Sequence, residues 1–512
     1  MFMFRYAMMF IVASFCVIPP ATAQAPNTAQ NTPLGAAVFS ERDAVTQGNW
    51  NGRSGKLGYS LPGFETLFPA EIRLDWAPNV STYVWEDETD DVRGAVSPVT
   101  GETRRAAACR FASQGPLEFD LDLGNTWRKV TFYFCDWDHR DRSQWIRISD
   151  SQGNLLHETG LTSFSEGELL SWRAYGKIHV RISSFGRTNA VIGAVFVDPL
   201  NTEEITESVE ATTRMDASET ATPRRKIVFL AGTASHGHGS HEHNAGSLYL
   251  AKILERVAPV RCVVCLNCVS GMALPDTCED ADCIVTFADG DEYHPLRGHA
   301  ETLNRLAAKG CGFVFLHYAT VPYQESTDGL VTTNPDYELI RDTSGGVYEH
   351  FLTVNPFLVG RFDSFTDHPV TRGVSPFDIY DEWYFHLRFA GGISTEEILL
   401  QGADSPVVPI LICVPPDEAK SGPDGEYSGN AIVRGRLGMP EIVACVTQRP
   451  DGGRGFCFTG GDIHQNFMNS DYRKTLVNGI LWTSGLNVPH DGFKTETPTP
   501  EELLKNQDEP AP

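Results

Sequence analysis

Beyond residue 225 the chain alternates short apolar runs with amphipathic segments, and this alternation constrains the fold more than any other feature. The run "KIVFLAG" is followed by a segment whose apolar residues recur at helical spacing, and "VRCVVCL", "DCIVTFADG" and "GFVFLHYA" continue the alternation. Near-continuous apolar strands separated by helices predict a parallel sheet with helices on both faces. We therefore expect residues 226–490 to form a doubly wound, flavodoxin-like α/β domain.

Residues 34–200 follow a different pattern. Short runs alternate apolar and polar side chains, as where Leu117, Phe119 and Leu121 are separated by acidic residues. A period of two predicts half-buried antiparallel strands, and no helical pattern of any length interrupts them. The chain is thus predicted to be multidomain, with an N-terminal all-β sandwich or jelly roll before the α/β domain.

Three polar segments border these domains. Residues 24–33 have the composition of a flexible leader, residues 201–225 that of a linker, and residues 491–512 that of a disordered tail. Each has few large apolar side chains, so we expect none of them to contribute to a core.

The first 23 residues have the features of a secretory signal peptide. Arg5 precedes an apolar stretch, and the small-x-small triplet Ala21-Thr22-Ala23 follows it. The stretch is shorter than the roughly 20 residues that span a bilayer, which argues against a membrane anchor. Cleavage is expected after Ala23, leaving a periplasmic or secreted protein with no membrane insertion.

Charge and cysteine content narrow the range of partners. The formal net charge is -25, from 66 acidic and 41 basic residues, so the chain repels nucleic acid. Loss of Cys16 with the signal leaves an odd number of the 12 cysteines. Cys109 with Cys135 and Cys278 with Cys283 are candidate disulfides; the three cysteines of "CVVCLNC" are either cluster ligands or, as we favour, buried thiols.

Four polar clusters follow four predicted strands of the α/β domain. Ligands of open parallel sheets bind outside the carboxyl ends of the strands, so these clusters are expected to meet at one rim. Surface loops or helix caps are the alternative for any one of them. The residues that we assign to substrate binding here are His236, His241, His243, Asn244, Asp289, His294, Tyr318, Gly460, Gly461 and Asn466.

A fifth block, "DEWYFHLRF", combines carboxylates with aromatic residues. A pyranose stacks its C–H faces on rings while its hydroxyls need in-plane hydrogen-bond partners, so this block suits a sugar. An aromatic core strand is the alternative. From this block we assign Trp383, Tyr384 and His386 to binding and Glu382 to catalysis.

Two chemistries remain open for the rim. In the first, His317 and His464 act as acid and base near the ordinary histidine pKa of about 6.5, supported by Glu382. In the second, a divalent metal ion is held by histidines, with His241, His243 and His294 as the candidates. The spacing His241-x-His243 differs from the HExxH motif of helical zinc sites.

The blocks "HGHGSHEHNAG", "DGDEYHP", "LHYA", "DEWYFH" and "TGGDIHQNF" together resemble the ThuA-like (trehalose-utilisation) family over most of residues 225–488. The resemblance implies a flavodoxin-like fold related to class I glutamine amidotransferases and a role in carbohydrate metabolism. Those amidotransferases use a cysteine nucleophile at the strand end where this chain has His317, so glutamine hydrolysis is not expected. The last family motif carries a histidine where this chain has Asp462.

The sequence therefore predicts a carbohydrate-processing protein acting on a glycoside or oxidised sugar as a lyase, hydratase or hydrolase. A non-catalytic sugar-binding protein and a metal-dependent hydrolase are the alternatives. In the β-rich part, Trp50, Trp76 and Trp85 form either a stacking platform or core. The sugar and the oligomeric state stay open.

Overall fold

The computed structural model describes residues 35–185, 188–219, 224–327 and 330–509. The predicted signal peptide, its cleavage site and the leader lie outside these ranges. Within them, no helix combines the length and the apolar character that a membrane span requires.

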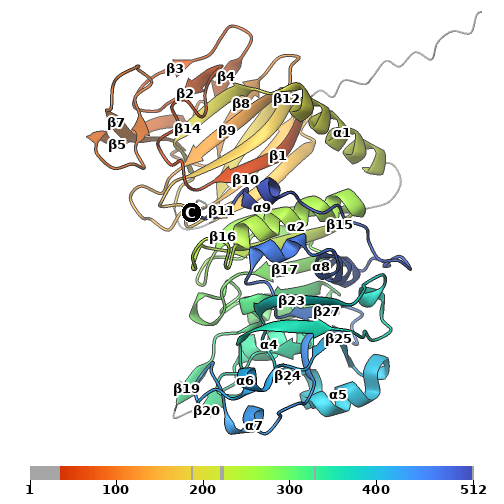
Figure 1. Ribbon diagram of the computed structural model, residues 1–512. Coiled ribbons are helices and arrows are strands. Elements are labelled where there is room, and N and C mark those ends of the chain that lie inside the picture. The colour runs from red at the N-terminus through yellow and green to blue at the C-terminus, as the bar shows by residue number, and fades with distance from the viewer. Residues whose placement is uncertain (1–34, 186–187, 220–223, 328–329, 510–512) are drawn as a thin grey trace, which may run out of the picture. The chain divides into compact units, whose positions relative to one another are not determined.

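The N-terminal part consists of antiparallel sheets, as expected (Figure 1). Strand β12 (Glu168–Ser184) is long enough to serve two of them. Its first half pairs with β1 (Gly35–Asp43) and β9 (Arg128–Phe134), and its second half pairs with β8 (Leu117–Asp122) and β10 (Ser143–Asp150). The other strands are β2 (Gly58–Ser60), β3 (Thr66–Leu67), β4 (Arg73–Trp76), β5 (Val80–Thr89), β6 (Ala95–Val96), β7 (Arg105–Ala112), β11 (Leu155–Thr162), β13 (Val191–Ile192) and β14 (Ala194–Pro199).

The tryptophans considered as a stacking platform do not form one. Trp50 is buried in the core of this part, and its ring lies 5.0 Å from that of Phe196. Trp76 is half-buried against Phe119, with 4.7 Å between the ring centroids. The guanidinium of Arg142 lies over the ring of Trp85. The alternative prediction, that these tryptophans pack within the domain, therefore fits them better than a shared exposed surface.

The C-terminal part is built on a mixed sheet with the strand order β16-β15-β17-β18-β27-β26-β25. The first five strands run parallel. Strand β26 is antiparallel to β27 and to β25, which the sequence prediction of a purely parallel sheet did not include. The bounds are β15 (Arg225–Gly232), β16 (Val260–Cys268), β17 (Cys283–Phe287), β18 (Gly312–Leu316), β25 (Val407–Cys413), β26 (Glu441–Gln448) and β27 (Arg454–Phe458).

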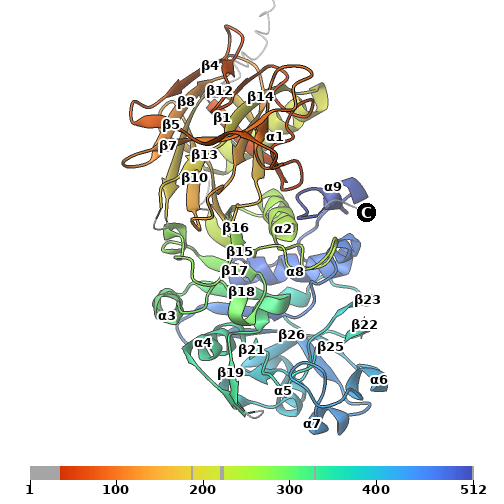
Figure 2. The same ribbon diagram turned by 90° about the vertical axis from the view of Figure 1, so that its left-hand side faces the viewer.

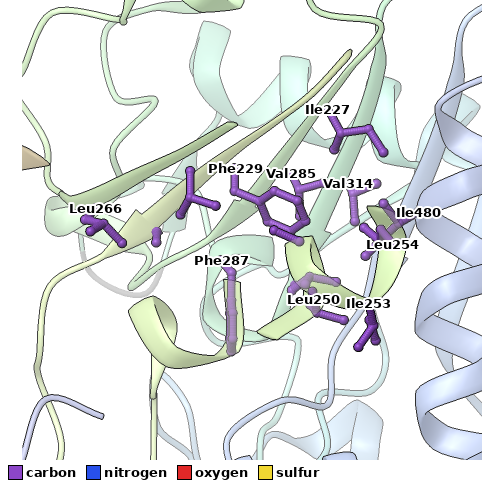
Figure 3. Packing of buried hydrophobic residues seen from close by; sticks show 14 of the residues in the cluster. Ile227, Phe229, Leu250, Ile253, Leu254, Leu266, Val285, Phe287, Val314 and Ile480 are labelled. Carbon is purple, nitrogen blue, oxygen red and sulfur yellow. The ribbon is translucent and has the colours of Figure 1, made fainter. Parts of the chain in front are cut away.

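Helices cover both faces of this sheet, because successive side chains of a buried strand point to opposite sides. Ile227 and Phe229 of β15 pack with α2 (His243–Val257) and α8 (Ser470–Thr483), as Figure 3 shows. Val228 and Leu230 belong to a separate core with α3 (Ala300–Ala308) and α4 (Pro335–Ser344). The expected α/β architecture with two helical layers is therefore present.

The loops beyond the sheet contain small elements. The strands are β19 (Glu325–Thr327), β20 (Leu330–Thr332), β21 (Gly346–Val347), β22 (Phe357–Phe362), β23 (Phe377–Glu382) and β24 (Arg388–Phe389). The helices are α5 (Thr395–Gln401), α6 (Asp417–Lys420) and α7 (Ala431–Arg434). The strands β22 and β23 pair as an antiparallel ladder.

The two parts are joined more closely than a linker would require. Strand β11 pairs in parallel with β16, Thr159 opposite Val264, so one sheet continues from one part into the other. The segment expected to be a flexible linker instead forms α1 (Thr202–Glu219). The side chain of Asn201 accepts a hydrogen bond from the Glu204 amide and the Glu204 carboxylate accepts one from the Asn201 amide, which caps the helix start.

The segment expected to be a disordered tail is also ordered up to Glu509. It contains α9 (Pro500–Leu504), which begins with a capping box between Thr499 and Glu502. Leu503 is buried, and the Asp508 carboxylate accepts a hydrogen bond of 2.5 Å from Arg42. A short apolar contact and an ion pair thus fix a segment whose composition alone indicated disorder.

A buried polar network surrounds this ion pair. The Arg42 guanidinium also donates to the carboxylate of Glu168 at 2.7 Å and to the side-chain oxygen of Asn267 at 3.2 Å. The Asn244 amide donates to Asn267 at 2.7 Å and to Asp508 at 3.1 Å. The network therefore links the N-terminal sheets, the start of α2 and the C-terminal segment.

All eleven cysteines in the described ranges are free thiols, including both candidate disulfide pairs. Cys265 and Cys268 of β16 are buried, and Cys262 is half-buried. The reading of "CVVCLNC" as strand thiols agrees with this placement.

Candidate functional site: a two-histidine centre

His241 lies in the loop between β15 and α2, with a left-handed backbone at φ 50°. Its Nδ1 is 2.7 Å from an Asp289 carboxylate oxygen at the end of β17. Burial opposes ionisation of Asp289, but the hydrogen bond from His241 and the neighbouring His243 lower its pKa to about 2. Because an ionised carboxylate only accepts, Nδ1 of His241 carries the proton of this bond.

His317 directly follows β18 and also has a left-handed backbone, with φ 53°. Its Nδ1 is 2.9 Å from the backbone oxygen of Thr459, which follows β27. A carbonyl can only accept, so Nδ1 donates. Burial and the adjacent His241 hold the pKa of His317 well below its usual range, which leaves the ring neutral and the lone pair on Nε2.

The two imidazoles meet through their Nε2 atoms, which lie 3.1 Å apart. A Glu382 carboxylate oxygen from the end of β23 is 3.5 Å from Nε2 of His317, and the Tyr384 hydroxyl is 3.3 Å from it. Asp462, after β27, places an oxygen 3.3 Å from Nε2 of His241. We call these five residues the two-histidine centre: His241, His317, Glu382, Tyr384 and Asp462.

The donor set of the centre fits a divalent cation. Ligand atoms of His241, His317 and Glu382 all lie within 4.8 Å of one another, and a second group of this kind, His236, His241 and Asp289, shares His241. Histidines that bind metal through Nε2 usually donate a hydrogen bond from Nδ1 to a carboxylate or a carbonyl. Here His241 donates to the Asp289 carboxylate, and His317 donates to the Thr459 carbonyl. Both rings are therefore oriented as metal ligands.

Glu382 is the group of the centre that titrates near neutral pH. Burial and the nearby carboxylate of Asp462 raise its pKa to about 7. The Tyr384 hydroxyl donates to it at 3.1 Å. A carboxyl with this pKa exchanges a proton readily at neutral pH, as an acid or base does.

The centre is mostly buried and is partly exposed at Glu382. His317 is fully buried, whereas the Glu382 side chain keeps 16% of its surface exposed. His236 is exposed, and its ring lies over that of His241 with 3.7 Å between centroids. Tyr318 is half-buried, its ring 5.9 Å from that of His241. Residues that follow β15, β17, β18 and β27 thus meet at one edge of the sheet.

His243, the neighbour of His241, lies behind the centre. It is fully buried at the start of α2, its Nδ1 is 3.1 Å from the Thr233 oxygen, and its Nε2 is 3.7 Å from Asp289. Burial lowers its pKa to about 4. It supports Asp289 and does not face the two Nε2 atoms.

His294, predicted as a metal candidate, is not brought to the centre. Its Nδ1 accepts from the Leu296 amide at 3.1 Å, and its Nε2 is 3.0 Å from the Ala319 oxygen. Both nitrogens are thus occupied by backbone, and burial lowers the pKa to about 4. A histidine at a strand end can hold two loops together through its two ring nitrogens, and His294 does so here.

The neutral state of His294 predicts acid sensitivity. Its pKa is about 4 in the folded protein and about 6.5 when unfolded, so the unfolded state binds the extra proton more readily. The stability contribution is complete above about pH 6.5 and is lost as the pH falls toward 4, about 3 kcal/mol in all. His294→Gln is expected to flatten the decline in unfolding free energy between these values.

Urea unfolding at several pH values measures this slope. His490→Gln serves as the control, because His490 is exposed. An unchanged slope in His294→Gln contradicts the prediction.

His464, expected to pair with His317, also lies elsewhere. Its Nε2 is 3.1 Å from the Leu503 oxygen of α9, and burial lowers its pKa to about 4. Asn244 is fully buried in the polar network, and Asn466 donates to the Tyr380 oxygen at 2.9 Å. These side chains bind neighbouring segments of the chain, so no contact of theirs joins them to the centre.

The two glycines after Thr459 serve packing. A Cβ on Gly460 would meet the Trp383 ring at 2.8 Å, and one on Gly461 would meet the His317 Cβ at 3.2 Å. The Gly461 amide donates to Asp381 at 2.9 Å. Their expected role as amide donors to a ligand therefore does not fit Gly461.

The aromatic block divides between core and centre. Trp383 is fully buried, with rings of Phe362 and Phe458 within 5.7 Å, so the core-strand alternative describes it. Tyr384 belongs to the centre. His386 lies beside Arg388 and Arg436; burial and these cations lower its pKa to about 4.

Sequence reasoning missed the roles of two aspartates. Asp462, seen only as a departure from a motif, contributes a carboxylate to the centre. Asp381 is fully buried and accepts from the Gly461 and Ile463 amides and from the Tyr472 hydroxyl at 2.9 Å, so it shapes the loop that carries Asp462. Burial raises its pKa to about 6. The alternation in "FDIYDE" places Asp381 on the same buried face as Phe377 and Ile379, and this pattern could have identified it from the sequence.

This part is an α/β protein whose polar centre lies at the carboxyl ends of parallel strands, the place where ligands bind in open α/β sheets. Residues 231–483 match the model of the ThuA family, described as trehalose utilisation. This domain therefore belongs to the ThuA-like family, as the sequence motifs indicated.

Solved structures similar to the chain include a protein from Bacteroides uniformis described as ThuA-like, with 14% identity, a TM-score of 0.34 and coverage of 51% of this chain and 92% of that one. One from Parabacteroides merdae, also described as ThuA-like, has 16% identity, a TM-score of 0.29 and coverage of 54% and 96%. TmCBM61, solved with beta-1,4-galactotriose, has 15% identity, a TM-score of 0.15 and coverage of 25% and 85%. No curated protein matches the sequence.

Proposed function

We propose that the protein is a carbohydrate-processing enzyme whose two-histidine centre binds a divalent cation. His241, His317 and Glu382 would be the ligands. The sugar substrate is inferred from the family description of trehalose utilisation. The strand order 2-1-3-4-5 of the parallel part supports the flavodoxin-like assignment, in which ligands bind at this rim.

One observation carries the proposal: two Nε2 atoms face each other at 3.1 Å while both Nδ1 atoms are committed to acceptors. Two neutral rings in this arrangement direct lone pairs at each other, which is unfavourable in a buried site. A cation between them removes the conflict and satisfies the carboxylates of Glu382 and Asp462 as well.

Such a cation, when bound, polarises a substrate oxygen or lowers the pKa of a water molecule. The chain supplies the remaining functions. Asp289 and Thr459 orient the two rings, and the Tyr384 hydroxyl positions the Glu382 carboxylate. The half-buried Tyr318 and the exposed His236 lie beside the ring of His241.

Cation binding is the first test. Metal-free protein titrated with Zn²⁺ or Co²⁺ in a calorimeter is expected to bind about one cation per chain, and Glu382→Gln is expected to weaken binding by at least about tenfold. Glutamine is the chosen replacement because it keeps the volume and shape of the glutamate side chain and removes its charge. Protein that binds neither cation at stoichiometric amounts contradicts the proposal.

Turnover is the second test. Trehalose, other glycosides and their oxidised derivatives are incubated with the protein and followed by mass spectrometry, with and without chelator. Conversion that chelator stops and Zn²⁺ or Co²⁺ restores supports the proposal. Binding of unaltered sugar alone would support the non-catalytic alternative.

A metal-free acid–base centre is the second candidate, favoured by the position of His241 between two carboxylates. Asp289 and Asp462 lie 2.7 Å and 3.3 Å from its two nitrogens. A proton on Nε2 of His241 would then take the place of the cation between the two rings and donate to Nε2 of His317. Turnover that is unaffected by chelator would select this candidate.

A further inference from the structure

The hairpin of β22 and β23 exposes an apolar face. Alternate residues point inward, and their neighbours point to solvent. On the outer face Phe357 is 49% exposed, Val359 45% and Tyr380 52%. Figure 2 shows both strands at the outside of the α/β part. Large apolar side chains that gather on one exposed face mark a binding surface more often than scattered ones do.

This face is continuous with the two-histidine centre. Glu382 is the last residue of β23 and lies on the same side of the strand as Tyr380, because side chains two apart share a face. In the ladder Phe357 is directly opposite Glu382, and Val359 is opposite Tyr380. Directly opposed residues have Cβ atoms about 5 Å apart, so the Phe357 side chain is adjacent to Glu382 of the centre.

The two rings form one surface. The centroids of Phe357 and Tyr380 lie 5.8 Å apart with 26° between the planes, which is a stacked arrangement. Polar groups border them: the Asn355 amide donates to Glu382 at 3.0 Å, and Arg361 lies 3.6 Å from Asp378. An apolar surface with hydrogen-bonding groups at its edge matches the C–H face and the hydroxyl edge of a pyranose.

We propose that Phe357, Val359 and Tyr380 form an aromatic platform that binds a second sugar ring of a glycoside whose first ring occupies the two-histidine centre. The inference rests on the proposed function for the identity of the ligand as a sugar. The substrate would then be a disaccharide or longer glycoside.

The size of the platform favours a sugar over a protein partner. A large aromatic side chain buries about 150–250 Å², so three half-exposed apolar side chains offer less than about 400 Å². A stable protein interface needs about 800 Å² on each side. One sugar ring is of the size that the platform covers.

Binding of glucose and of three disaccharides, trehalose, maltose and cellobiose, tests the platform by calorimetry. The wild-type protein is expected to bind at least one disaccharide about tenfold more tightly than glucose, and the Phe357→Ala, Tyr380→Ala double variant to lose most of this difference while its glucose affinity stays the same. Tyr83→Ala is the matched control, because Tyr83 is 51% exposed and its ring also packs on a neighbour, Trp85.

Three outcomes overturn the platform: no preference for any disaccharide in the wild type, an unchanged preference in the double variant, or an equal loss of glucose and disaccharide affinity. The same measurement in a His317→Ala background separates the two proposals. A platform effect that persists there while cation binding is absent in the wild type would contradict the cation centre alone.

Discussion

His317→Ala is expected to abolish cation binding and turnover. The substitution removes one of two imidazole ligands and leaves Nε2 of His241 without its partner at 3.1 Å. Loss of an outer-shell partner alone costs about 10–100-fold in metal affinity, so loss of a direct ligand is expected to cost at least about 100-fold. Calorimetric titration with Zn²⁺ measures the affinity, and mass spectrometry measures turnover.

His464→Ala is the matched control for this variant. Both histidines are almost fully buried and follow strands of the sheet, but His464 contacts the backbone of Leu503. We expect His464→Ala to lower the free energy of unfolding and to leave cation affinity unchanged. Thermal unfolding followed by circular dichroism establishes that both variants fold. Retained cation binding in His317→Ala, or its loss only in His464→Ala, would contradict the assignment.

Arg42→Ala is expected to destabilise the fold by about 3–5 kcal/mol. The side chains of Arg42, Glu168 and Asp508 are 2%, 6% and 7% exposed, so the substitution leaves two carboxylates buried without their cation. Removing one partner of a buried ion pair costs far more than removing a surface pair. Urea unfolding of both proteins at one pH measures the difference.

Arg73→Ala provides the comparison, since Arg73 pairs with Asp75 where both side chains are exposed. It is expected to change the unfolding free energy by less than about 1 kcal/mol. An effect of Arg42→Ala as small as that of Arg73→Ala would show that the network does not hold the two sheets and the C-terminal segment together.

Hydrophobic periodicity was sufficient for the main features of the fold. The alternation around Leu117 identified half-buried strands, and the apolar runs after residue 225 identified a sheet with helices on both faces. It was insufficient for α1 and α9, because their order comes from capping interactions and a few buried contacts such as that of Leu503. Strand β26, which runs against the others, is an apolar run whose direction no local pattern reveals.

The candidate site was predictable to the extent that strand ends determine it. That rule placed His241, Asp289 and His317 at one rim. It could not distinguish His464 or His294 from them, because the direction of a side chain after a strand depends on the loop conformation. The exposed faces of Phe357 and Tyr380 depend on the pairing of β22 with β23 across the loop 363–376, so they too required the structure.

Arg42 and Asp508 are 466 positions apart, and this separation has a consequence for biosynthesis. A ribosome releases Arg42 and Glu168 long before it has made the carboxylate that completes their network. The N-terminal sheets can fold during translation, but the full set of ionic contacts can form only after Asp508 has been synthesised. In a nascent chain that has not yet reached Asp508, Arg42 would therefore be paired with Glu168 alone and would lack its second carboxylate.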